Sequence, residues 1–450
     1  MENATKINRS EKIRDNVFGF YAENKEFCDY NYKLAEDENI DKIYDDVENE
    51  VEINSLLTKT SIVLLTANKY EKNILHQRIH SLSAKPIRRM EIDLLCACER
   101  FNKVFAYWFK WSGYSVLHIH ANVTGSYTIG GSADIVRWIL SNKYLFPTAI
   151  ISFGICFGTK ENESILGDVI ISKKIYPYFV GVKVKDETLT VVDDNVFSIN
   201  SGLYSQIRKL KENNKFNSLG FKVEFDNYIT GEAVVSSSKA RNQFVRTTTQ
   251  NILAGDMEGY GLFKESNSLN NKIPCLIIKS ICDWGTEKNF DEKDEKILNQ
   301  FKNKIHITFS APSNNDSSAE YILKTLKDRI QAFSASCAFD ALNIIMKNNV
   351  FETSILDHIR EWINAHTGAA TTCKMIQEAA CNIMDKLEYQ ASMSKHFIHR
   401  SIMILAEEGL LQCEKSCITY SYNHDGCINI KKDESIYINK KENNECMSQI

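Results

Sequence analysis

The strongest constraint on the fold of this 450-residue chain is a set of short, mostly apolar runs separated by helix-like segments. Three of these runs cover residues 61–66, 148–153 and 273–281. Strands that are buried on both faces of a sheet have this continuous apolar character, whereas half-exposed strands alternate apolar and polar side chains. The alternation of such strands with helices predicts an α/β domain with a mostly parallel sheet.

The remaining pattern divides the chain into three parts. Residues 1–57 form a polar, acidic extension with one or two helices, residues 58–312 form the α/β domain, and residues 319–450 form a mainly helical accessory domain. Three helices followed by short β segments in the last part are typical of a winged helix. Further strands are expected at 104–108, 114–120, 169–172, 178–184 and 231–236, and helices at 132–140, 201–211, from 257 and at 319–333.

Composition narrows the class of protein. Hydrophobic residues make up 43% of the chain and charged residues 25%, which is typical of a soluble globular protein. The net charge of −4 gives no broad basic surface for nucleic acid. No run reaches the roughly 18 apolar residues that a membrane helix needs, and no secretory signal opens the chain. Thirteen cysteines without a C-x-x-C pair favour a reduced, cytoplasmic protein without a zinc site.

Two acidic segments follow elements of the predicted sheet. In residues 254–261, Asp256 and Glu258 flank Met257 at the start of a helix with spaced glycines. In residues 279–285, an apolar strand ends on Asp283. Open α/β sheets bind their ligands at the carboxyl ends of the strands, so these segments are expected to form one ligand site.

Five motifs occur in an order that resembles a known family. They are Thr66-Ala67-x-x-x-Glu71, Gly154-x-Cys156-x-Gly158, Leu166-Gly167-Asp168-Val169-x-x-Ser172, Asp256-Met257-Glu258 and Ile281-Cys282-Asp283. Together they resemble the nucleoside phosphorylase superfamily, and most closely the methylthioadenosine/S-adenosylhomocysteine nucleosidases, over residues 58–310. The resemblance implies a central mixed sheet flanked by helices, and cleavage of an N-glycosidic bond through an oxocarbenium-like ribosyl cation.

The resemblance implies roles for three side chains. Asp283 matches the acid that protonates N7 of a leaving adenine, Glu258 the carboxylate that accepts both ribose hydroxyls, and Met257 the residue against the sugar face. Taken alone, each has a plainer explanation. Asp283 could cap a strand end, Glu258 could be an ordinary first-turn glutamate that the helix dipole favours, and Met257 could fill the core.

The nucleophile depends on Glu71. In the hydrolytic branch of the family, a glutamate four positions after the alanine of the first turn activates water, and Glu71 has that spacing from Ala67. Phosphorylases hold phosphate with arginines, and Ser152 stands at one of those places. Water is therefore the expected nucleophile, with phosphorolysis as the alternative. Taken alone, Glu71 could also be a solvated helix residue.

Further positions are expected to contact the substrate: Asp256, Gly154, Ile155, Cys156, Ser238, Lys239 and Arg241. The glycines of the second motif, Gly154 and Gly158, would let the backbone approach the sugar and base. The aromatic that usually stacks on adenine is missing from its place, and Phe244, Phe153 or Phe157 could replace it. Lys239, Arg241 and Arg246 could meet a 5′-phosphate chain, which would make ATP a substrate, or could be solvated surface charges.

No cofactor or metal is expected, because this chemistry needs neither. His118 and His120 share one face of a strand and could form a metal pair, although satisfied structural histidines explain them as well. The family forms homo-oligomers, so a dimer or larger assembly is expected.

The C-terminal part suggests an interaction domain. Residues 331–450 contain eleven lysine and arginine residues against fifteen aspartate and glutamate residues, a net charge of −4. This disfavours a DNA-binding face and favours a protein partner or self-association. The alternative is a nucleoside-sensing regulator that binds DNA. An enzyme fused to extra domains also resembles the nucleosidase effectors of bacterial antiviral systems, which deplete adenine nucleotides.

Overall fold

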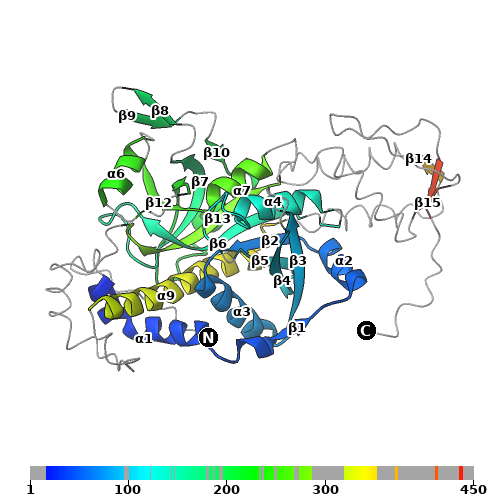
Figure 1. The fold of residues 1–450 in the computed structure, drawn as a ribbon, viewed down its shortest axis with the longest axis horizontal. Coiled ribbons are helices and arrows are strands. Elements are labelled where there is room, and N and C mark those ends of the chain that lie inside the picture. The colour runs from blue at the N-terminus through cyan, green and yellow to red at the C-terminus, as the bar shows by residue number, and fades with distance from the viewer. Residues whose placement is uncertain are drawn as a thin grey trace.

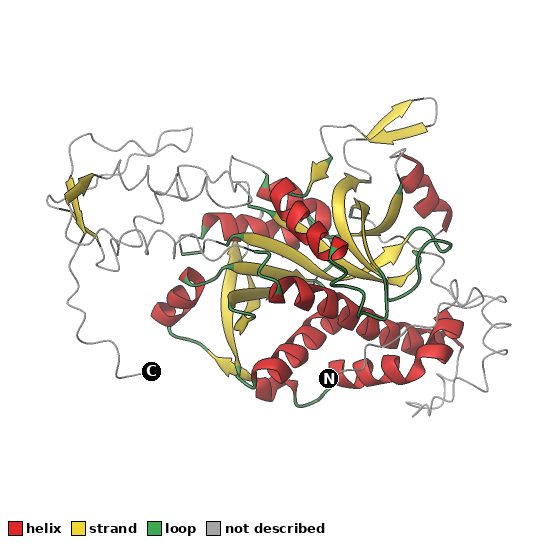
Figure 2. Ribbon diagram, turned by 180° about the vertical axis from the view of Figure 1, so that it is seen from behind, coloured by secondary structure: helices red, strands yellow, loops and turns green. Residues whose placement is uncertain are grey.

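A mixed eleven-stranded sheet lies between two layers of helices (Figures 1 and 2). The computed structural model describes residues 17–95, 101–121, 123–142, 144–145, 147–178, 182–185, 188–191, 196–232, 235, 238–247, 251–267, 273–285 and 319–351, and three later strands. None of the helices in these ranges combines the length and apolarity that a membrane crossing would require.

The strands of the large sheet are β1 (Tyr44–Asp46), β2 (Ile62–Thr66), β3 (Ile87–Leu95), β4 (Phe101–Trp111), β5 (Tyr114–His120), β6 (Ala149–Gly158), β7 (Val169–Pro177), β10 (Phe197–Ser198), β11 (Val223–Thr230), β12 (Ile252–Asp256) and β13 (Cys275–Asp283). Their order is β1-β3-β4-β5-β2-β6-β12-β11-β7-β10, and β13 pairs with both β6 and β7. Separate small sheets join β8 (Val182–Lys185) to β9 (Thr188–Val191), and β14 (Ala370–Thr372) and β15 (Leu411–Cys413) to β16 (Ser435–Ile438).

Five strands of the large sheet close into a ring. β6 pairs with β12, β12 with β11, β11 with β7, β7 with β13, and β13 returns to β6. A closed ring has no free edge among its members and surrounds a packed interior. β13 is buried over its whole length except for its last residue, Asp283. The ring therefore holds a strand rigidly and presents one carboxylate at its end.

The sheet is mixed, as the family resemblance implied, rather than mostly parallel, as the strand–helix alternation alone suggested. β4 is antiparallel to both β3 and β5. The reason is a tight connection between β4 and β5, in which Ser112 and Gly113 have φ angles of 49° and 90°. Two consecutive positive φ angles form a hairpin turn, which joins antiparallel neighbours and leaves no room for a crossover helix.

Several predicted strand boundaries were wrong. The strand expected at 169–172 continues as β7 to Pro177, and the strand expected from residue 178 does not include Tyr178. The strand expected at 148–153 continues through Gly154 as β6 to Gly158. The strand expected at 231–236 does not begin at Gly231; β11 ends at Thr230, just before it. Four of the eight residues of β11 are polar, so its sequence does not form the apolar run that would have predicted a strand here.

The helices are α1 (Val17–Ala35), α2 (Glu50–Thr58), α3 (Lys69–Ser83), α4 (Ser132–Ser141), α5 (Ser201–Glu212), α6 (Ser238–Thr247), α7 (Gly259–Ser266) and α9 (Ala319–Lys347), with a short 3₁₀ helix at Ile40–Ile43. α1, α3 and α9 form one layer, and α9 packs on β13 and β6. α4 and α7 pack together on the opposite face, above β2 and β6 in Figure 1, whereas α9 and α1 lie below these strands.

Helix α9 is part of the sheet domain by its contacts. Ser334 donates a hydrogen bond to the carbonyl of Ile281 at 3.0 Å, and the ring of Trp111 stacks on Phe339 with centroids 5.0 Å apart. The boundaries at 57/58 and 312/319 stay predictions, and both α1 and α9 lie outside them while packing on α3. Most of the predicted winged helix lies outside the described residues.

We expect Phe339→Ala to destabilise the sheet domain. Phe339, on α9, is 1% exposed and stacks on Trp111, and removal of a buried phenylalanine ring costs about 3–5 kcal/mol. Chemical denaturation of the full chain measures the difference. Lys324→Ala, at an exposed position of the same helix, is the control and should change stability by less than about 0.5 kcal/mol. Equal stabilities of the two variants would contradict the packing of α9 on the sheet.

Candidate functional site

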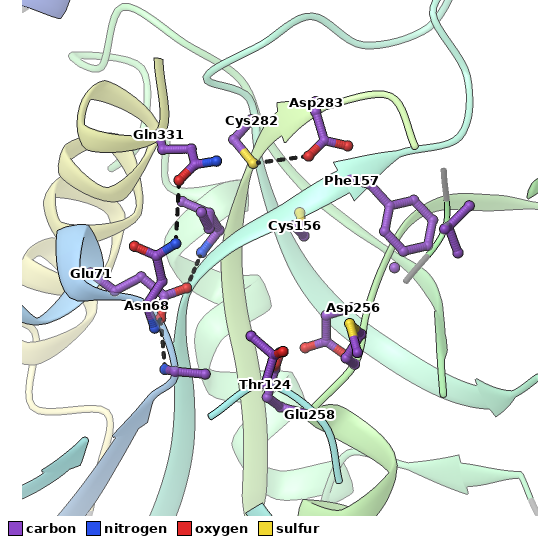
Figure 3. A pocket seen from close by; sticks show the side chains of 15 residues that line it. Asn68, Glu71, Thr124, Cys156, Phe157, Asp256, Glu258, Cys282, Asp283 and Gln331 are labelled. Atoms are coloured by element: carbon purple, nitrogen blue, oxygen red, sulfur yellow. Dashed lines mark hydrogen bonds between the residues drawn. The ribbon is translucent and has the colours of Figure 1, made fainter. Parts of the chain in front are cut away.

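A cavity of about 190 Å³ lies where the carboxyl ends of β2, β6, β12 and β13 meet. Its lining includes the carboxylates Glu71, Asp256, Glu258 and Asp283. Figure 3 shows Asp283 and Cys282 at one end, Glu71 and Asn68 on one side, and Asp256 and Glu258 below them. The acidic residues singled out in the sequence therefore converge on a single site.

Glu71 is held at the start of α3 by a capping box. Asn68 is the N-cap, and its side chain accepts a hydrogen bond from the N–H of Tyr70 at 2.8 Å. Glu71 Oε2 accepts the backbone N–H groups of Ala67 and Asn68 at 2.8 and 2.9 Å. Glu71 is 2% exposed, so its interpretation as a solvated helix residue is wrong.

A third backbone group and a glycine complete the surroundings of Glu71. Its Oε1 accepts the N–H of Ile155 at 2.8 Å. Gly154 has a φ of +143°, and a Cβ there would lie 2.0 Å from Glu71 Oε1. Similarly, a Cβ at Gly158 would lie 2.5 Å from the Trp284 ring. These glycines, which were expected to make room for sugar and base, make room for Glu71 and Trp284.

Glu71 titrates near neutrality. Burial raises the pKa of Glu71, the ammonium of Lys279 lowers it, Glu258 raises it and the backbone donors lower it, and the resulting pKa is about 7. A carboxylate has about four acceptor positions, of which three are taken by backbone N–H groups. One position remains for a water molecule in the cavity, and a base with this pKa is well matched to accept its proton.

Lys279, in the middle of β13, joins the acidic residues beneath the cavity. Its ammonium donates to Glu258 Oε2 at 2.7 Å and lies 2.9 Å from Asp256 Oδ2. Burial lowers the pKa of Lys279, but the charges of Asp256, Glu258 and Glu71 outweigh burial and raise it well above its usual value. No role was predicted for Lys279; a lone charge inside an otherwise apolar run was the signal that could have identified it.

Asp256 and Glu258 are fixed by different groups. Asp256 Oδ1 accepts the hydroxyl of Thr230 at 2.9 Å and the N–H of Gly259 at 3.0 Å, so it also caps α7. Glu258 is the N-cap residue of α7, but its side chain makes no capping hydrogen bond. Its Oε1 accepts the N–H of Gly125 at 3.4 Å, which leaves its carboxylate at the cavity wall beside Met257.

Asp283 lies on the turn that follows β13. Its Oδ1 accepts the N–H of Gly285 at 2.7 Å, and the Cys282 thiol donates to Oδ2 at 3.6 Å. The strand-end capping interpretation is therefore correct for Oδ1. The same carboxylate also lines the cavity, so capping holds its orientation rather than removing it from the site.

The other predicted contact residues fall into two groups. Ile155 and Cys156 line the cavity, whereas Ser238, Lys239 and Arg241 on α6 are not part of its lining. Lys239 is exposed, as is Arg246. Arg241 is 4% exposed and binds Glu161 and the carbonyl of Trp284.

Of the three candidate aromatic residues, Phe157 lines the cavity, on the side away from Glu71 in Figure 3. Phe153 is fully buried, and Phe244 stacks on Tyr178 with ring centroids 4.9 Å apart. Three polar lining residues had no predicted role: Asn68, Thr124 and Gln331. Asn68 donates to Gln331 at 3.2 Å, so α9 contributes to the cavity wall.

The two strand histidines belong to a buried hydrogen-bond chain. His118 Nε2 and His120 Nδ1 lie 2.8 and 2.9 Å from the hydroxyl of Thr66, and His118 also contacts His76. Burial lowers the pKa of His120 to about 4, so it is neutral at pH 7. In the part of the chain that the structure describes, no cluster of three or more histidine, cysteine or acidic residues is arranged to hold a metal ion.

Comparisons with known proteins return nucleosidases, the class that the five motifs resemble. No protein-family model matches the chain. A "Death domain-containing ATP nucleosidase" of Amphimedon queenslandica is 26% identical over 231 residues, which are 46% of this chain and 40% of that protein. The chain therefore spans less than half the length of this curated relative.

Two solved structures illustrate the structural similarity. The 5′-methylthioadenosine/S-adenosylhomocysteine nucleosidase of Neisseria meningitidis, in complex with methylthio-immucillin-A, is 16% identical, with a TM-score of 0.44, and the match covers 64% of this chain and 99% of that one. The Helicobacter pylori enzyme of the same name is 13% identical, with a TM-score of 0.45, and the match covers 64% and 98%.

We expect Lys279→Met to lower stability by about 3–5 kcal/mol, because it leaves buried carboxylates without their counter-charge. Denaturant unfolding of the full chain measures this loss. Lys173→Met, at an exposed position of the neighbouring strand β7, is the matched control. If both variants unfold at the same denaturant concentration, Lys279 does not balance the cluster.

Proposed function

We propose that this chain is an N-glycosidase that hydrolyses the bond between adenine and ribose in an adenine nucleoside or nucleotide. The observation that carries the proposal is the convergence of Asp283, Glu258 and Glu71 on one cavity, from three segments far apart in the sequence. The similarity to an ATP nucleosidase of Amphimedon queenslandica supports an adenine nucleotide as substrate.

In this proposal, Asp283 is the general acid. Adenine is a poor leaving group as an anion, so its N7 must receive a proton as the bond between N9 and C1′ breaks. The Gly285 N–H binds Oδ1 of Asp283, so Oδ2, which accepts the Cys282 thiol, is the oxygen that carries the proton toward the base. Phe157, in the cavity wall, offers a ring face for the purine.

Glu258 and its neighbours stabilise the sugar. An ionised carboxylate accepts hydrogen bonds from two adjacent hydroxyl groups, which suits the 2′ and 3′ positions of ribose. Two carboxylates and the ammonium of Lys279 give this cluster a net charge of −1. A fixed negative charge beside the ribose stabilises the positive charge that develops at C1′ in the transition state.

Glu71 is the general base. It takes a proton from a cavity water, whose oxygen then forms a bond with C1′. The products are free adenine, which carries the proton from Asp283, and a ribose that keeps the 5′ group of the substrate. No lysine or arginine is among the described residues that line the cavity, which supports water rather than phosphate as nucleophile.

Substitution of the proposed acid or base should abolish adenine release. We expect Asp283→Asn and Glu71→Gln each to lower the rate by about 10²–10⁴-fold, the usual contribution of a positioned proton donor or acceptor. Chromatographic measurement of adenine from methylthioadenosine, adenosine, AMP and ATP, with and without added phosphate, tests this. Glu212→Gln, at an exposed position of α5, is the control and should retain full activity.

Two other outcomes of this assay would contradict hydrolysis of an adenine nucleoside or nucleotide. Phosphate-dependent release with ribose 1-phosphate as product would assign a phosphorylase instead. Absence of adenine from all four compounds in the wild-type protein would contradict the proposed function.

The pKa of Glu71 sets the pH dependence. Because the base must be ionised and its pKa is about 7, kcat/KM should decrease as pH falls through 7. The expected loss between pH 8 and pH 6 is about tenfold. A pH profile of adenine release measures it, and the residual activity of Glu71→Gln should lack this limb. A limb that persists unchanged in that variant would belong to another group.

A further inference from the structure

Arg241 is a buried arginine that the sequence associated with a phosphate chain. It lies on α6 and is 4% exposed, whereas Lys239 and Arg246 on the same helix are exposed. Its Nη1 donates to the backbone carbonyl of Trp284 at 2.6 Å and to Glu161 Oε1 at 2.8 Å. A buried guanidinium with these partners is charge-balanced and hydrogen-bonded inside the protein.

The carbonyl that Arg241 binds belongs to the turn that carries the proposed acid. Trp284 stands between Asp283 and Gly285, and the N–H of Gly285 donates to Asp283 Oδ1 at 2.7 Å. Arg241 therefore holds the peptide between Trp284 and Gly285 by its oxygen, while the nitrogen of the same peptide holds the carboxylate. A shift of this peptide would turn the Asp283 side chain.

The turn is wedged on its other side against β6. The Trp284 ring fills the space beside Gly158, where a Cβ would lie 2.5 Å from the ring, and Trp284 is 4% exposed. A Cβ at Gly285, which has a φ of +57°, would lie 3.3 Å from the Phe157 ring. The turn thus lies between the ring of a cavity residue and the guanidinium of Arg241.

We propose that Arg241 is a positioning residue for Asp283 and does not bind the 5′ group of the substrate. This inference rests on the proposed function, because it assigns Arg241 to the acid of that reaction. Nη1, the nitrogen that holds the turn, is already shared between Glu161 and the Trp284 carbonyl, so a phosphate that bound it would release the turn. Loss of Arg241 should therefore slow the proton-transfer step for every substrate, whatever its 5′ group.

The test compares Arg241→Met, Arg241→Lys and a surface control in the full chain. Arg208→Gln is the control, because Arg208 also pairs with a glutamate at 2.8 Å but is 60% exposed on α5. For each compound that the wild type cleaves, kcat and KM of adenine release are measured. We expect Arg241→Met to lower kcat about 100-fold, the loss typical of a misplaced catalytic group, with KM changed less than about threefold.

Two further variants distinguish a positioning role of Arg241 from a purely structural one. Arg241→Lys keeps a cationic donor that can reach the Trp284 carbonyl, so its kcat should be at least about tenfold higher than that of Arg241→Met. Glu161→Gln removes the negative charge of the second partner of Arg241. The Glu161 side chain is 34% exposed, so this variant should fold, and it should lower kcat by less than Arg241→Met. This variant keeps the inference testable if Arg241→Met does not fold.

The outcomes that overturn the inference are distinct. An unchanged kcat with a raised KM for phosphorylated compounds alone would make Arg241 a phosphate ligand. Unchanged kcat and KM in Arg241→Met would show that it does not position the acid. Absence of adenine release by the wild type would contradict the proposed function itself, and the inference with it.

Discussion

The contact on which the site depends is the buried ammonium of Lys279 between the carboxylates of Asp256 and Glu258. Charged groups are costly to remove from water unless they are paired and hydrogen-bonded. β13 delivers the lysine from inside the closed ring, where 3% of its side chain is exposed. Burial raises the pKa of the neighbouring Glu71 carboxyl, and within the cluster the ammonium of Lys279 lowers that pKa while Glu258 raises it. A cationic sugar would be attracted to this place.

Rigid elements carry each of the reacting groups in the proposal. Glu71, at the start of α3, is fixed by three backbone N–H groups, two just before this helix and one on β6. Asp283 is fixed by a turn between β6 and α6. Gly154 leaves space for the first carboxylate, because a Cβ would overlap it. Groups that are held in this way do not have to reorganise when charge develops, which is the main source of electrostatic catalysis.

Local sequence patterns revealed the parts of the fold that depend on local chemistry. The apolar runs located β2, β6 and β13, and the acidic segments located the cavity. Patterns could not show that β11 completes the ring, because its side chains are only partly apolar, nor that β6 continues through Gly154. They also could not show what α9 packs on, or that the Arg241 guanidinium points into the protein, since both depend on contacts between distant segments.

A crystal structure of the Asp283→Asn variant with an uncleaved adenine nucleoside or nucleotide in the cavity tests the central claim most directly. The account predicts adenine N7 at hydrogen-bond distance from residue 283, both ribose hydroxyls on Glu258, and a water molecule between Glu71 and C1′. A purine bound elsewhere, or a ribose that faces away from Glu258 and Glu71, would contradict it.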